Sequence, residues 1–323
     1  MPEPTIDDIR AAAQRIQNVI HRTPVLTCAT LDRLCDANIY FKCENFQKTG
    51  SFKIRGAANA VFSLSPEDAS RGVATHSSGN HAAAVALAAR LRGITAYVVM
   101  PRTAPRIKKN AVAGYGAEIV FCEPTLAARQ EGLAEIVRQT GAVEVHPYNN
   151  YDVMAGQGTS ALELCEEVGN LDAVVAPIGG GGLLSGTAIA LSSISPATKV
   201  IGAEPANADD AARSLQAGKI LPAGDPVTIA DGLRTGVGTL TFPVIKQLVS
   251  DIITAEEELI AEALLLVWER MKVVIEPSSA VPLAVLLRRR GAIPGRRIGI
   301  ILSGGNVDIG AVARSLPANV SKK

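Results

Sequence analysis

The stretch Lys48-Thr49-Gly50-Ser51-Phe52-Lys53-Ile54-Arg55-Gly56-Ala57 decides how this sequence is interpreted. Lys53 lies directly after an aromatic residue and two residues before a second cation, in a run that is otherwise mostly apolar. When burial or a nearby cation lowers its pKa, a lysine keeps a neutral amine that can form a Schiff base with a carbonyl compound. Most lysines are solvated and unreactive, so these ten residues alone favour a helix start with a basic face over a covalent role. The rest of the chain decides between these two interpretations.

Short strands and helices alternate along most of the chain, and Lys53 is expected where a loop becomes a helix. Alternation of this kind indicates right-handed β-α-β crossovers on parallel sheets. A length of 323 residues allows two domains. Helices are expected at residues 6–20, 52–64, 82–91, 105–113, 125–139, 157–168, 183–192, 242–248, 256–272 and 279–290, and strands at 39–44, 73–76, 96–100, 118–121, 173–178, 199–203 and 297–302.

These elements predict an α/β protein with two doubly wound open sheets and an active site between its domains. One unit of alternating strands and helices ends near His146, and a second unit follows it. We therefore expect a large domain formed by residues 1–72 and 147–323, and a small mobile domain formed by residues 73–146.

The composition favours a small-molecule partner over nucleic acid or membrane. A hydrophobic fraction of 47% with 20% charged residues is typical of a globular protein with a large core. The 32 Lys and Arg residues nearly balance 31 Asp and Glu residues, so no net field attracts nucleic acid or an anionic membrane. The acidic N-terminus and the absence of a long apolar run predict a cytoplasmic protein. Its five widely spaced cysteines, without a Cys-x-x-Cys pair, are expected to be reduced thiols.

Four consecutive glycines, Gly179, Gly180, Gly181 and Gly182, follow an expected strand and precede an expected helix. Without side chains, their backbone N–H groups can close on an anion at the positive end of the helix. The loop lacks the spacing of a P-loop or of a dinucleotide site. A flexible turn is the alternative, but a tight turn rarely needs more than one or two glycines. The loop therefore predicts a phosphate site.

Two further loops follow expected strands. Ser77-Ser78-Gly79-Asn80-His81 supplies hydroxyls, an amide and an imidazole at a helix start, which suits a carboxylate. A helix cap is the alternative, but it explains only part of this run. Ser303-Gly304-Gly305-Asn306 is the third glycine-containing loop. Because ligands of open α/β sheets bind beyond the carboxyl ends of strands, the three loops are expected to share one crevice.

An acidic segment, Glu204-Pro-Ala-Asn-Ala-Asp-Asp, follows the strand expected at residues 199–203. Hard oxygen ligands in a loop suit Mg²⁺ or Ca²⁺. The residues match no strict metal-loop spacing, so by themselves they favour a solvated acidic turn.

A reactive lysine, a phosphate loop and a carboxylate loop fit a single cofactor. Pyridoxal phosphate carries an aldehyde for the amine, a phosphate for the glycines, and an electron sink for amino-acid chemistry. This combination favours the covalent role of Lys53 over the solvated one.

Motifs distributed over nearly the whole chain carry a family resemblance. Beside residues 41–57 they are Thr75-His-Ser-Ser-Gly-Asn-His, Ala155-Gly-Gln-Gly-Thr, Gly179-Gly-Gly-Gly-Leu, the acidic segment from Glu204, Thr228-Ile-Ala-Asp-Gly and Leu302-Ser-Gly-Gly-Asn-Val-Asp. With these motifs the chain resembles the fold-type II pyridoxal-phosphate enzymes, whose fold is that of the tryptophan synthase β subunit. Within them it is most similar to serine racemases and to serine/threonine and 3-hydroxyaspartate dehydratases.

The resemblance implies a role for individual residues. Lys53 would hold pyridoxal phosphate covalently and act as the base on one face of the substrate, and Ser78 would carry a proton on the other face. For the cofactor it implies Phe52 beside the ring, Asn80 at the 3-hydroxyl oxygen, Gly179, Gly180, Gly181, Gly182 and Leu183 at the phosphate, and Ser303 at the pyridine nitrogen. For the substrate carboxylate it implies Ser77, Ser78, Asn80, His81 and Arg129, and for a divalent cation (Mg²⁺, or Ca²⁺ or Mn²⁺) Glu204, the Ala208 carbonyl and Asp210.

The activity implied by the resemblance is dehydration of a β-hydroxy amino acid to a 2-oxo acid and ammonia, together with racemisation, with serine as the favoured substrate. The hydroxyl of Ser78 favours racemisation, and a homodimer is expected. One alternative is a 3-hydroxyaspartate or threonine dehydratase with little racemisation, in which Arg234 could pair with a distal carboxylate. Less favoured alternatives are a β-replacement enzyme and a non-catalytic binder of the cofactor or of amino acids.

Overall fold

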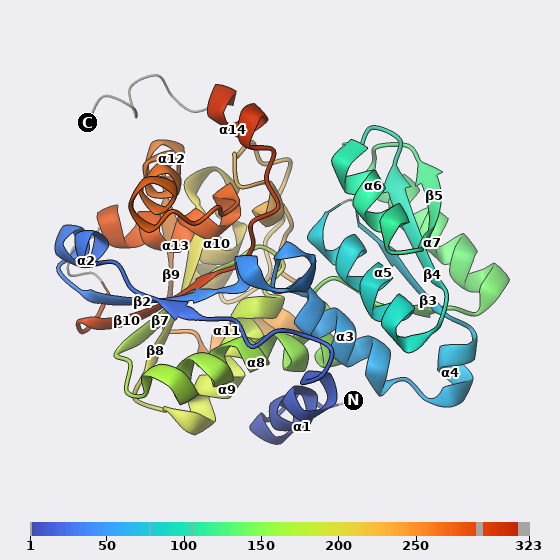
Figure 1. Ribbon diagram of the computed structural model, residues 1–323, viewed down its shortest axis with the longest axis horizontal. Coiled ribbons are helices and arrows are strands. Elements are labelled where there is room, and N and C mark those ends of the chain that lie inside the picture. Colours follow the sequence, from blue (N-terminus) through green and yellow to red (C-terminus); the bar gives the residue numbers. More distant parts are fainter. Residues whose placement is uncertain (1, 78, 105, 289–292, 316–323) are drawn as a thin grey trace.

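The computed structural model describes residues 2–77, 79–104, 106–288 and 293–315, which form two sheets surrounded by helices (Figure 1). Within these residues, all strand pairings are parallel except that of β1 with β2. The expected α/β class with two sheets is therefore confirmed. In spatial order, the larger sheet contains β1 (Val25–Leu26), β2 (Asn38–Cys43), β10 (Arg297–Leu302), β7 (Ala173–Pro177), β8 (Lys199–Pro205) and β9 (Asp251–Ala255), and the smaller sheet contains β5 (Glu118–Cys122), β4 (Ala96–Pro101), β3 (Val73–His76) and β6 (Val143–Glu144).

Helices cover both faces of the larger sheet, because its buried strands point successive side chains to opposite sides. Val175 packs into a cluster with α2 (Ala29–Cys35), α12 (Glu257–Leu266) and α13 (Pro277–Arg288). Its neighbour Val174 packs into the opposite cluster, with α8 (Tyr151–Val168), α9 (Gly182–Ile194) and α11 (Thr241–Leu248). The helix α1 (Ile6–Ile16) lies over α8 and α9.

The smaller sheet is covered in the same way. Val98 packs against α5 (Asn80–Arg92) and α6 (Arg106–Gly114), whereas Val99 packs against α7 (Leu126–Thr140). The helix α3 (Lys53–Ser63) shares a hydrophobic cluster with α5 and lies between the two sheets (Figure 1). The lysine at its first position therefore lies near the junction of both halves.

The described strands between residues 73 and 144 all belong to the smaller sheet, and the other described strands belong to the larger one. This division falls close to the expected domain boundaries at residues 72 and 146. The domains themselves, and the mobility of the smaller one, stay predictions.

Several elements differ from the expected ones. The first helix ends at Ile16 instead of Ile20, because the last side chain of its buried face is Ile16 and a turn follows. In the helix expected at residues 256–272, only Glu257–Leu266 is α-helical. Val267–Met271 forms a π-helical turn, which ends where Lys272 adopts a left-handed conformation. The elements that sequence patterns did not predict are β1, β6, β9, α2, α4 (Pro66–Ser70), α10 (Asp210–Ala217) and α14 (Ile309–Ser315).

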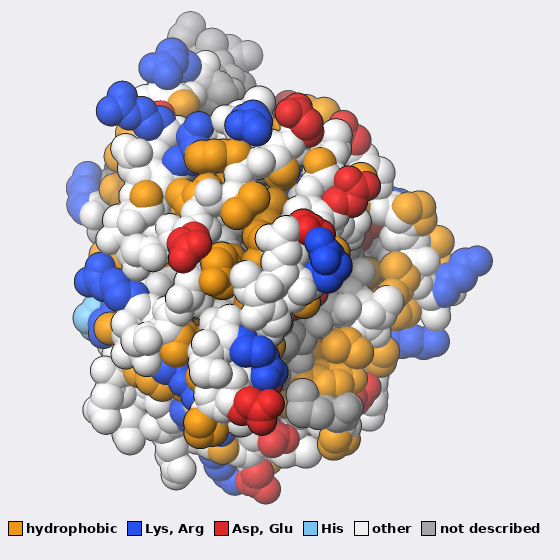
Figure 2. Space-filling view, turned by 90° about the vertical axis from the view of Figure 1, so that its right-hand side faces the viewer, with side chains coloured by type: hydrophobic (Ala, Val, Ile, Leu, Met, Phe, Trp, Pro, Cys, Tyr) orange, Lys and Arg blue, Asp and Glu red, His pale blue; other side chains and the backbone are white. Residues whose placement is uncertain are grey.

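The molecular surface carries charges of both signs. On the face shown in Figure 2, basic and acidic side chains are interspersed, and hydrophobic side chains form patches between them. No helix in the described part of the chain is long and apolar enough to cross a membrane.

Glycines allow α8 to approach its neighbours at backbone distance. A Cβ added at Gly186 of α9 would lie 2.4 Å from the carbonyl oxygen of Met154 and 2.6 Å from the nitrogen of Gly158, both in α8. These distances are too short for any side chain, so glycine is required for this packing.

We predict that Gly186→Ala lowers the free energy of unfolding by about 1–3 kcal/mol, the usual cost of overpacking. The measurement is urea unfolding followed by circular dichroism. Gly114→Ala in α6 is the matched control, because a Cβ there would meet nothing within 4 Å. It should leave stability unchanged or raise it by up to about 1 kcal/mol. Equal stability of Gly186→Ala and the wild type would contradict the packing argument.

Candidate active site

Lys53 is the first residue of α3, as expected for a loop that becomes a helix. Its half-buried side chain donates a hydrogen bond of 2.9 Å from Nζ to the carbonyl oxygen of Pro147. Burial lowers the pKa of Lys53 to about 8, although the nearby Glu276 carboxylate acts in the opposite direction. The amine also lies 5.1 Å from the ring centroid of Phe52. A substantial neutral fraction is therefore present near pH 8, as covalent chemistry requires.

The glycine loop forms a cradle at the N-terminus of α9. Gly181 has a φ of 92°, a left-handed conformation that favours glycine. A Cβ added at Gly180 would lie 2.2 Å from the ring of Tyr148, and one added at Gly179 would lie 3.1 Å from the Cα of Leu233. Side chains are thus excluded, and the loop presents only backbone at the positive end of a helix. This arrangement fits a phosphate group.

The first residue of α11 and the loop just before this helix hold the cradle in place. The carbonyl oxygen of Gly180 accepts hydrogen bonds from Thr241 Oγ1 at 2.7 Å and from the nitrogen of Gly238 at 3.2 Å. Leu183 is buried in the first turn of α9 and packs into the core of the larger sheet. The five residues expected at the phosphate thus lie in one loop and the first turn of α9.

Asn80 is the first residue of α5, next to the smaller sheet, and it bonds to Glu276 and Asn306 on the side of the larger sheet. Its Nδ2 donates to both carboxylate oxygens of Glu276 at 3.0 Å. Its Oδ1 accepts from Asn306 Nδ2 at 2.9 Å, and the same Nδ2 donates to the carbonyl oxygen of Thr49. Asn80 is therefore fixed beside the Lys53 stretch.

Glu276 is a site residue that sequence reasoning did not find. It is buried, and burial raises its pKa to about 7, even though the amide of Asn80 and the ammonium groups of Lys108 and Lys53 favour its charged form. A single glutamate before a proline gave no pattern to detect. It is bound to Asn80 and close enough to Lys53 for its charge to favour the ammonium form of the amine.

The Ser303 loop lies against the Lys53 stretch. The carbonyl oxygen of Ser303 accepts from the nitrogen of Phe52 at 3.0 Å, and Gly304 forms a β-bridge with Ser51. The buried Ser303 Oγ lies 3.0 Å from Ser279 Oγ, a partner that sequence reasoning also missed. The loop after β10 and the lysine thus meet as expected.

In the loop that follows β3, the described residues are positioned by backbone contacts. Ser77 Oγ accepts from the nitrogen of Gly79 at 3.3 Å. His81 is buried, and its Nε2 lies 2.8 Å from the carbonyl oxygen of Val145, to which a neutral ring donates. Burial and the charge of Lys53 lower the pKa of His81 to about 3, so the ring is neutral. Ser78, the expected second proton carrier, lies outside the described residues.

The two candidate arginines lie in different surroundings. Arg129 in α7 donates from Nε to the carbonyl oxygen of Thr125 at 3.3 Å, and its charge helps to lower the pKa of His76 beyond the effect of burial. Arg234 is exposed and donates from Nη2 to the carbonyl oxygen of Thr228 at 2.5 Å. Arg129 therefore lies near the substrate loop, whereas Arg234 is held by its own loop. Their substrate roles stay predictions.

The segment from His146 to Tyr148 contacts both Lys53, through Pro147, and the glycine loop, through Tyr148. His146 Nδ1 accepts from the backbone nitrogens of Asn149 at 2.9 Å and Tyr148 at 3.3 Å, and the two rings meet edge-on at 4.6 Å. Burial lowers the pKa of His146 to about 4. Its neutral ring shapes the turn that carries the Pro147 carbonyl. No sequence pattern distinguished Tyr148.

The acidic segment places two carboxylates in the protein interior. Glu204 accepts from the backbone nitrogens of Ala211 and Ala212 at 3.0 and 2.9 Å, and Asp210 accepts from that of Val237 at 3.3 Å. Burial raises the pKa of both groups, that of Glu204 to about 8. The charge of Asp209 raises both pKa values further, and that of Asp210 also raises the pKa of Glu204. The Ala208 carbonyl belongs to a short 3₁₀ turn between them.

A hard divalent cation fits this donor set, because it would stabilise the ionised forms of two buried carboxyl groups. Among the described residues, however, no group of three or more His, Cys, Asp or Glu side chains could hold a metal ion. A cation here would therefore also need carbonyl or water ligands.

The comparisons with known proteins agree with this geometry. A family model described as "Pyridoxal-phosphate dependent enzyme" matches residues 16–304. Serine racemase of Dictyostelium discoideum is 51% identical over 316 residues, covering 97% of this chain and 98% of that protein. The beta-hydroxyaspartate dehydratase of Paracoccus denitrificans is 53% identical over 306 residues, covering 95% of this chain and 97% of that protein. The solved structure of maize serine racemase has a TM-score of 0.94 at 46% identity and covers 97% of each chain. The chain therefore belongs to the fold-type II pyridoxal-phosphate-dependent enzymes, as a homologue of serine racemase and beta-hydroxyaspartate dehydratase.

Proposed function

We propose that this protein is a racemase and dehydratase of β-hydroxy amino acids, with serine as its substrate and pyridoxal phosphate as its cofactor. One observation carries the proposal: the amine of Lys53, with a lowered pKa, bonds to Pro147, next to the Tyr148 that packs on the glycine cradle. The stretch that carries Lys53 also contacts the Ser303 loop and, through Asn306, Asn80. The racemase and dehydratase homologues support the same activities. A specific alternative is a 3-hydroxyaspartate dehydratase, because the Paracoccus relative at 53% identity carries that name.

The protein's residues would hold the cofactor by its two ends. The glycine cradle at α9 would bind the phosphate, and Lys53 would bind the aldehyde carbon covalently. When bound, pyridoxal phosphate supplies an electron sink that makes the α-proton of an amino acid acidic. Asn80, fixed by Glu276 and Asn306, would donate to the oxygen on the cofactor ring.

Lys53 would then move the proton. With cofactor and substrate bound, the Lys53 amine would take the α-proton of the amino acid from one face. Ser303 would offer the ring nitrogen of the cofactor a hydroxyl, which holds a proton there less fully than a carboxylate does, and this would favour prompt loss of the β-hydroxyl over transamination. Ser78 would supply a proton on the opposite face, as inversion requires.

The arrangement of the two sheets suggests how the substrate is enclosed. The substrate loop at Ser77–Gly79 follows a strand of the smaller sheet, whereas the glycine cradle follows a strand of the larger sheet. We propose that residues 73–146 form a small domain that closes over the substrate and excludes water. The homodimeric state and the cytoplasmic location stay predictions from the sequence.

We predict that cofactor uptake by the apoprotein speeds up as the pH rises through about 8, because the neutral amine of Lys53 is the reacting form. The measurement is the growth of the yellow absorbance after addition of pyridoxal phosphate. Lys53→Ala should stay colourless and lose activity by about 10²-fold or more, the range for loss of a general base. Lys48→Ala, in the same stretch, is the control and should turn yellow. A colourless wild-type protein would sink the proposed function.

Ser78→Ala should abolish racemisation but keep most of the elimination, because Lys53 serves only one face of the substrate. The test is a panel of L-serine, D-serine, L-threonine and 3-hydroxyaspartate isomers, with oxo-acid release and enantiomer inversion both measured. Retained racemisation in the variant would refute the assignment of Ser78. Preference of the wild type for a 3-hydroxyaspartate isomer would favour the alternative substrate.

We also propose that Glu204, the Ala208 carbonyl and Asp210 bind Mg²⁺ or a similar cation. The support is the pair of buried carboxylates with raised pKa values. A carboxyl group whose pKa is raised on folding loses stabilisation as the pH rises from its unfolded to its folded value. For Glu204 this window runs from about 4.5 to about 8.

The chelated protein should therefore lose thermal stability across this window, and Mg²⁺ at 100 times its Kd should restore about 2.7 kcal/mol at pH 8. The measurement is thermal unfolding with EDTA and with Mg²⁺. Glu204→Gln should abolish the response to Mg²⁺. Asp209→Asn is the matched control and should respond normally, because Asp209 pairs with Arg213 at 2.7 Å and is partly exposed. An identical melting temperature of the wild type with and without Mg²⁺ would reject the site.

A further inference from the structure

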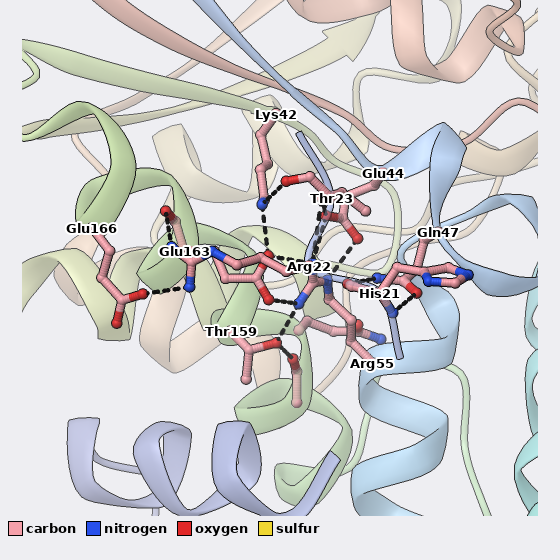
Figure 3. Close-up of polar contacts among 12 residues, drawn as sticks. His21, Arg22, Thr23, Lys42, Glu44, Gln47, Arg55, Thr159, Glu163 and Glu166 are labelled. Atoms are coloured by element: carbon pink, nitrogen blue, oxygen red, sulfur yellow. Dashed lines mark hydrogen bonds and ion pairs between the residues drawn. The ribbon is translucent and has the colours of Figure 1, made fainter. Parts of the chain in front are cut away.

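A buried network of ion pairs connects Arg55, in the first turn of α3, with Glu44, Glu163 and Lys42 (Figure 3). The guanidinium of Arg55 lies between two carboxylates and pairs with each through two hydrogen bonds. Toward Glu44, Nε and Nη2 donate at 2.6 and 2.8 Å. Toward Glu163, Nη1 and Nη2 both donate at 2.8 Å. Nη1 also donates to Thr159 Oγ1 at 3.0 Å. These bonds together fix both the position and the orientation of the guanidinium.

A second cation completes the network. Lys42 Nζ donates to Glu163 Oε2 at 2.6 Å and to the carbonyl oxygen of Thr23 at 2.7 Å. The side chains of Arg55, Glu44 and Lys42 are 0% exposed, and that of Glu163 is 13% exposed. Two positive and two negative charges therefore balance inside the protein.

Such a network is a costly way to gain stability. Removing charges from water costs free energy that their attraction only partly offsets, and replacement by apolar side chains of similar volume is often neutral or stabilising. Such a network does restrict geometry. A guanidinium that makes two hydrogen bonds to each of two carboxylates can adopt only one orientation. The network is thus better suited to fixing a position than to holding the fold together.

The position that it fixes is the first turn of α3. This helix has no side chain that caps its N-terminus, since Phe52 at the cap position makes no such bond. Arg55, two residues after Lys53, is instead bound to Glu44 in the turn after β2 and to Thr159 and Glu163 in α8. Lys53 in turn bonds to Pro147, which lies just before α8. Arg55 is thus bound to α8 itself, and Lys53 is bound to the segment that leads into α8.

The network does not act on Lys53 through its charge. The pKa of Lys53 is lowered by burial and is opposed by Glu276, and the balanced network contributes neither effect. A change at Arg55 should therefore move the amine rather than retune it through the field.

We propose that Arg55 is a positioning residue for Lys53: held between Glu44 and Glu163, it sets the place of the first turn of α3 relative to α8, and so the place of the amine. This inference rests on the proposed cofactor role of Lys53. It assigns to Arg55 a task in catalysis without any contact with the cofactor or the substrate.

The test is Arg55→Lys, which keeps the buried charge but loses the two-sided pairing. Misplacement of a reacting group by about 1 Å costs about 10²-fold in rate, so we expect kcat to fall by about 10- to 100-fold with little change in KM. In the apoprotein, the rate of yellow-colour formation with pyridoxal phosphate should fall at least about 10-fold. The midpoint of the spectral pH titration of the loaded protein should also move.

Two controls separate positioning from stability. Arg22→Lys alters an ion pair with Glu166 of the same helix α8. The two side chains of this pair are 55% and 49% exposed, and the bond from Arg22 to Glu163 goes to the backbone carbonyl. It should behave as the wild type in every measurement. Leu164→Ala truncates a buried core residue next to Glu163, and should lower the melting temperature without moving the uptake rate or the titration midpoint.

Thr159→Val serves where Arg55→Lys folds poorly, because it removes one bond to the guanidinium and keeps the side-chain volume. It should shift the uptake rate and the titration midpoint in the same direction by a smaller amount. The proposal is overturned if Arg55→Lys and Thr159→Val lose stability as Leu164→Ala does but keep the wild-type uptake rate and midpoint. A wild-type protein that never turns yellow would instead mean that the proposed function is wrong.

Discussion

The contact of α8 with α3 on one side and with α9 on the other is the constraint on which the active site depends. Gly156 of α8 meets the backbone of Arg55 and Gly56, and Gly158 meets the backbone of Gly186, so neither position has room for a Cβ. Gln157, between the two glycines, accepts from the nitrogen of Gly56 at 3.1 Å. One helix therefore sets the distance between the lysine at the start of α3 and the anion cradle at the start of α9. The motif Ala155-Gly-Gln-Gly-Thr contains the residues that this packing requires.

Buried charges in this protein fall into two groups with different consequences. Around Arg55 every charge has a close partner, and the group as a whole is neutral. Elsewhere the balance is incomplete: the pKa of Lys53 is lowered to about 8, and those of Glu276 and Glu204 are raised to about 7 and about 8. Groups whose pKa values are strongly shifted gather at functional sites, because binding or catalysis supplies the missing charge or proton. The groups with strongly shifted pKa values lie at the sites proposed above for the cofactor and the cation, whereas the neutral group around Arg55 lies between α3 and α8.

The sequence predicts those parts of the site that are local patterns. Lys53 and the four glycines stand out because their neighbours along the chain are unusual, and the parallel strands follow from their apolar runs. Glu276 does not stand out, since its partner Asn80 lies 196 positions away. The partners of Arg55 are equally hidden, because Glu163 is an ordinary glutamate of an amphipathic helix until the fold brings it 2.8 Å from the guanidinium. Sequence patterns therefore find the residues proposed to react, but not the contacts that these residues make with distant parts of the chain.

The order of strands in the larger sheet has a consequence for biosynthesis. Strand β2 pairs with β10, with Asn38 beside Arg297, although almost the whole described chain separates them. The smaller sheet uses strands that are close in sequence and can form early, whereas contacts of such long range form late. On a ribosome, the Ser303 loop cannot reach the Lys53 stretch until β10 has emerged. The growing chain should therefore carry an unreactive lysine for most of its synthesis, and acquire a complete cofactor site only in its last step of folding.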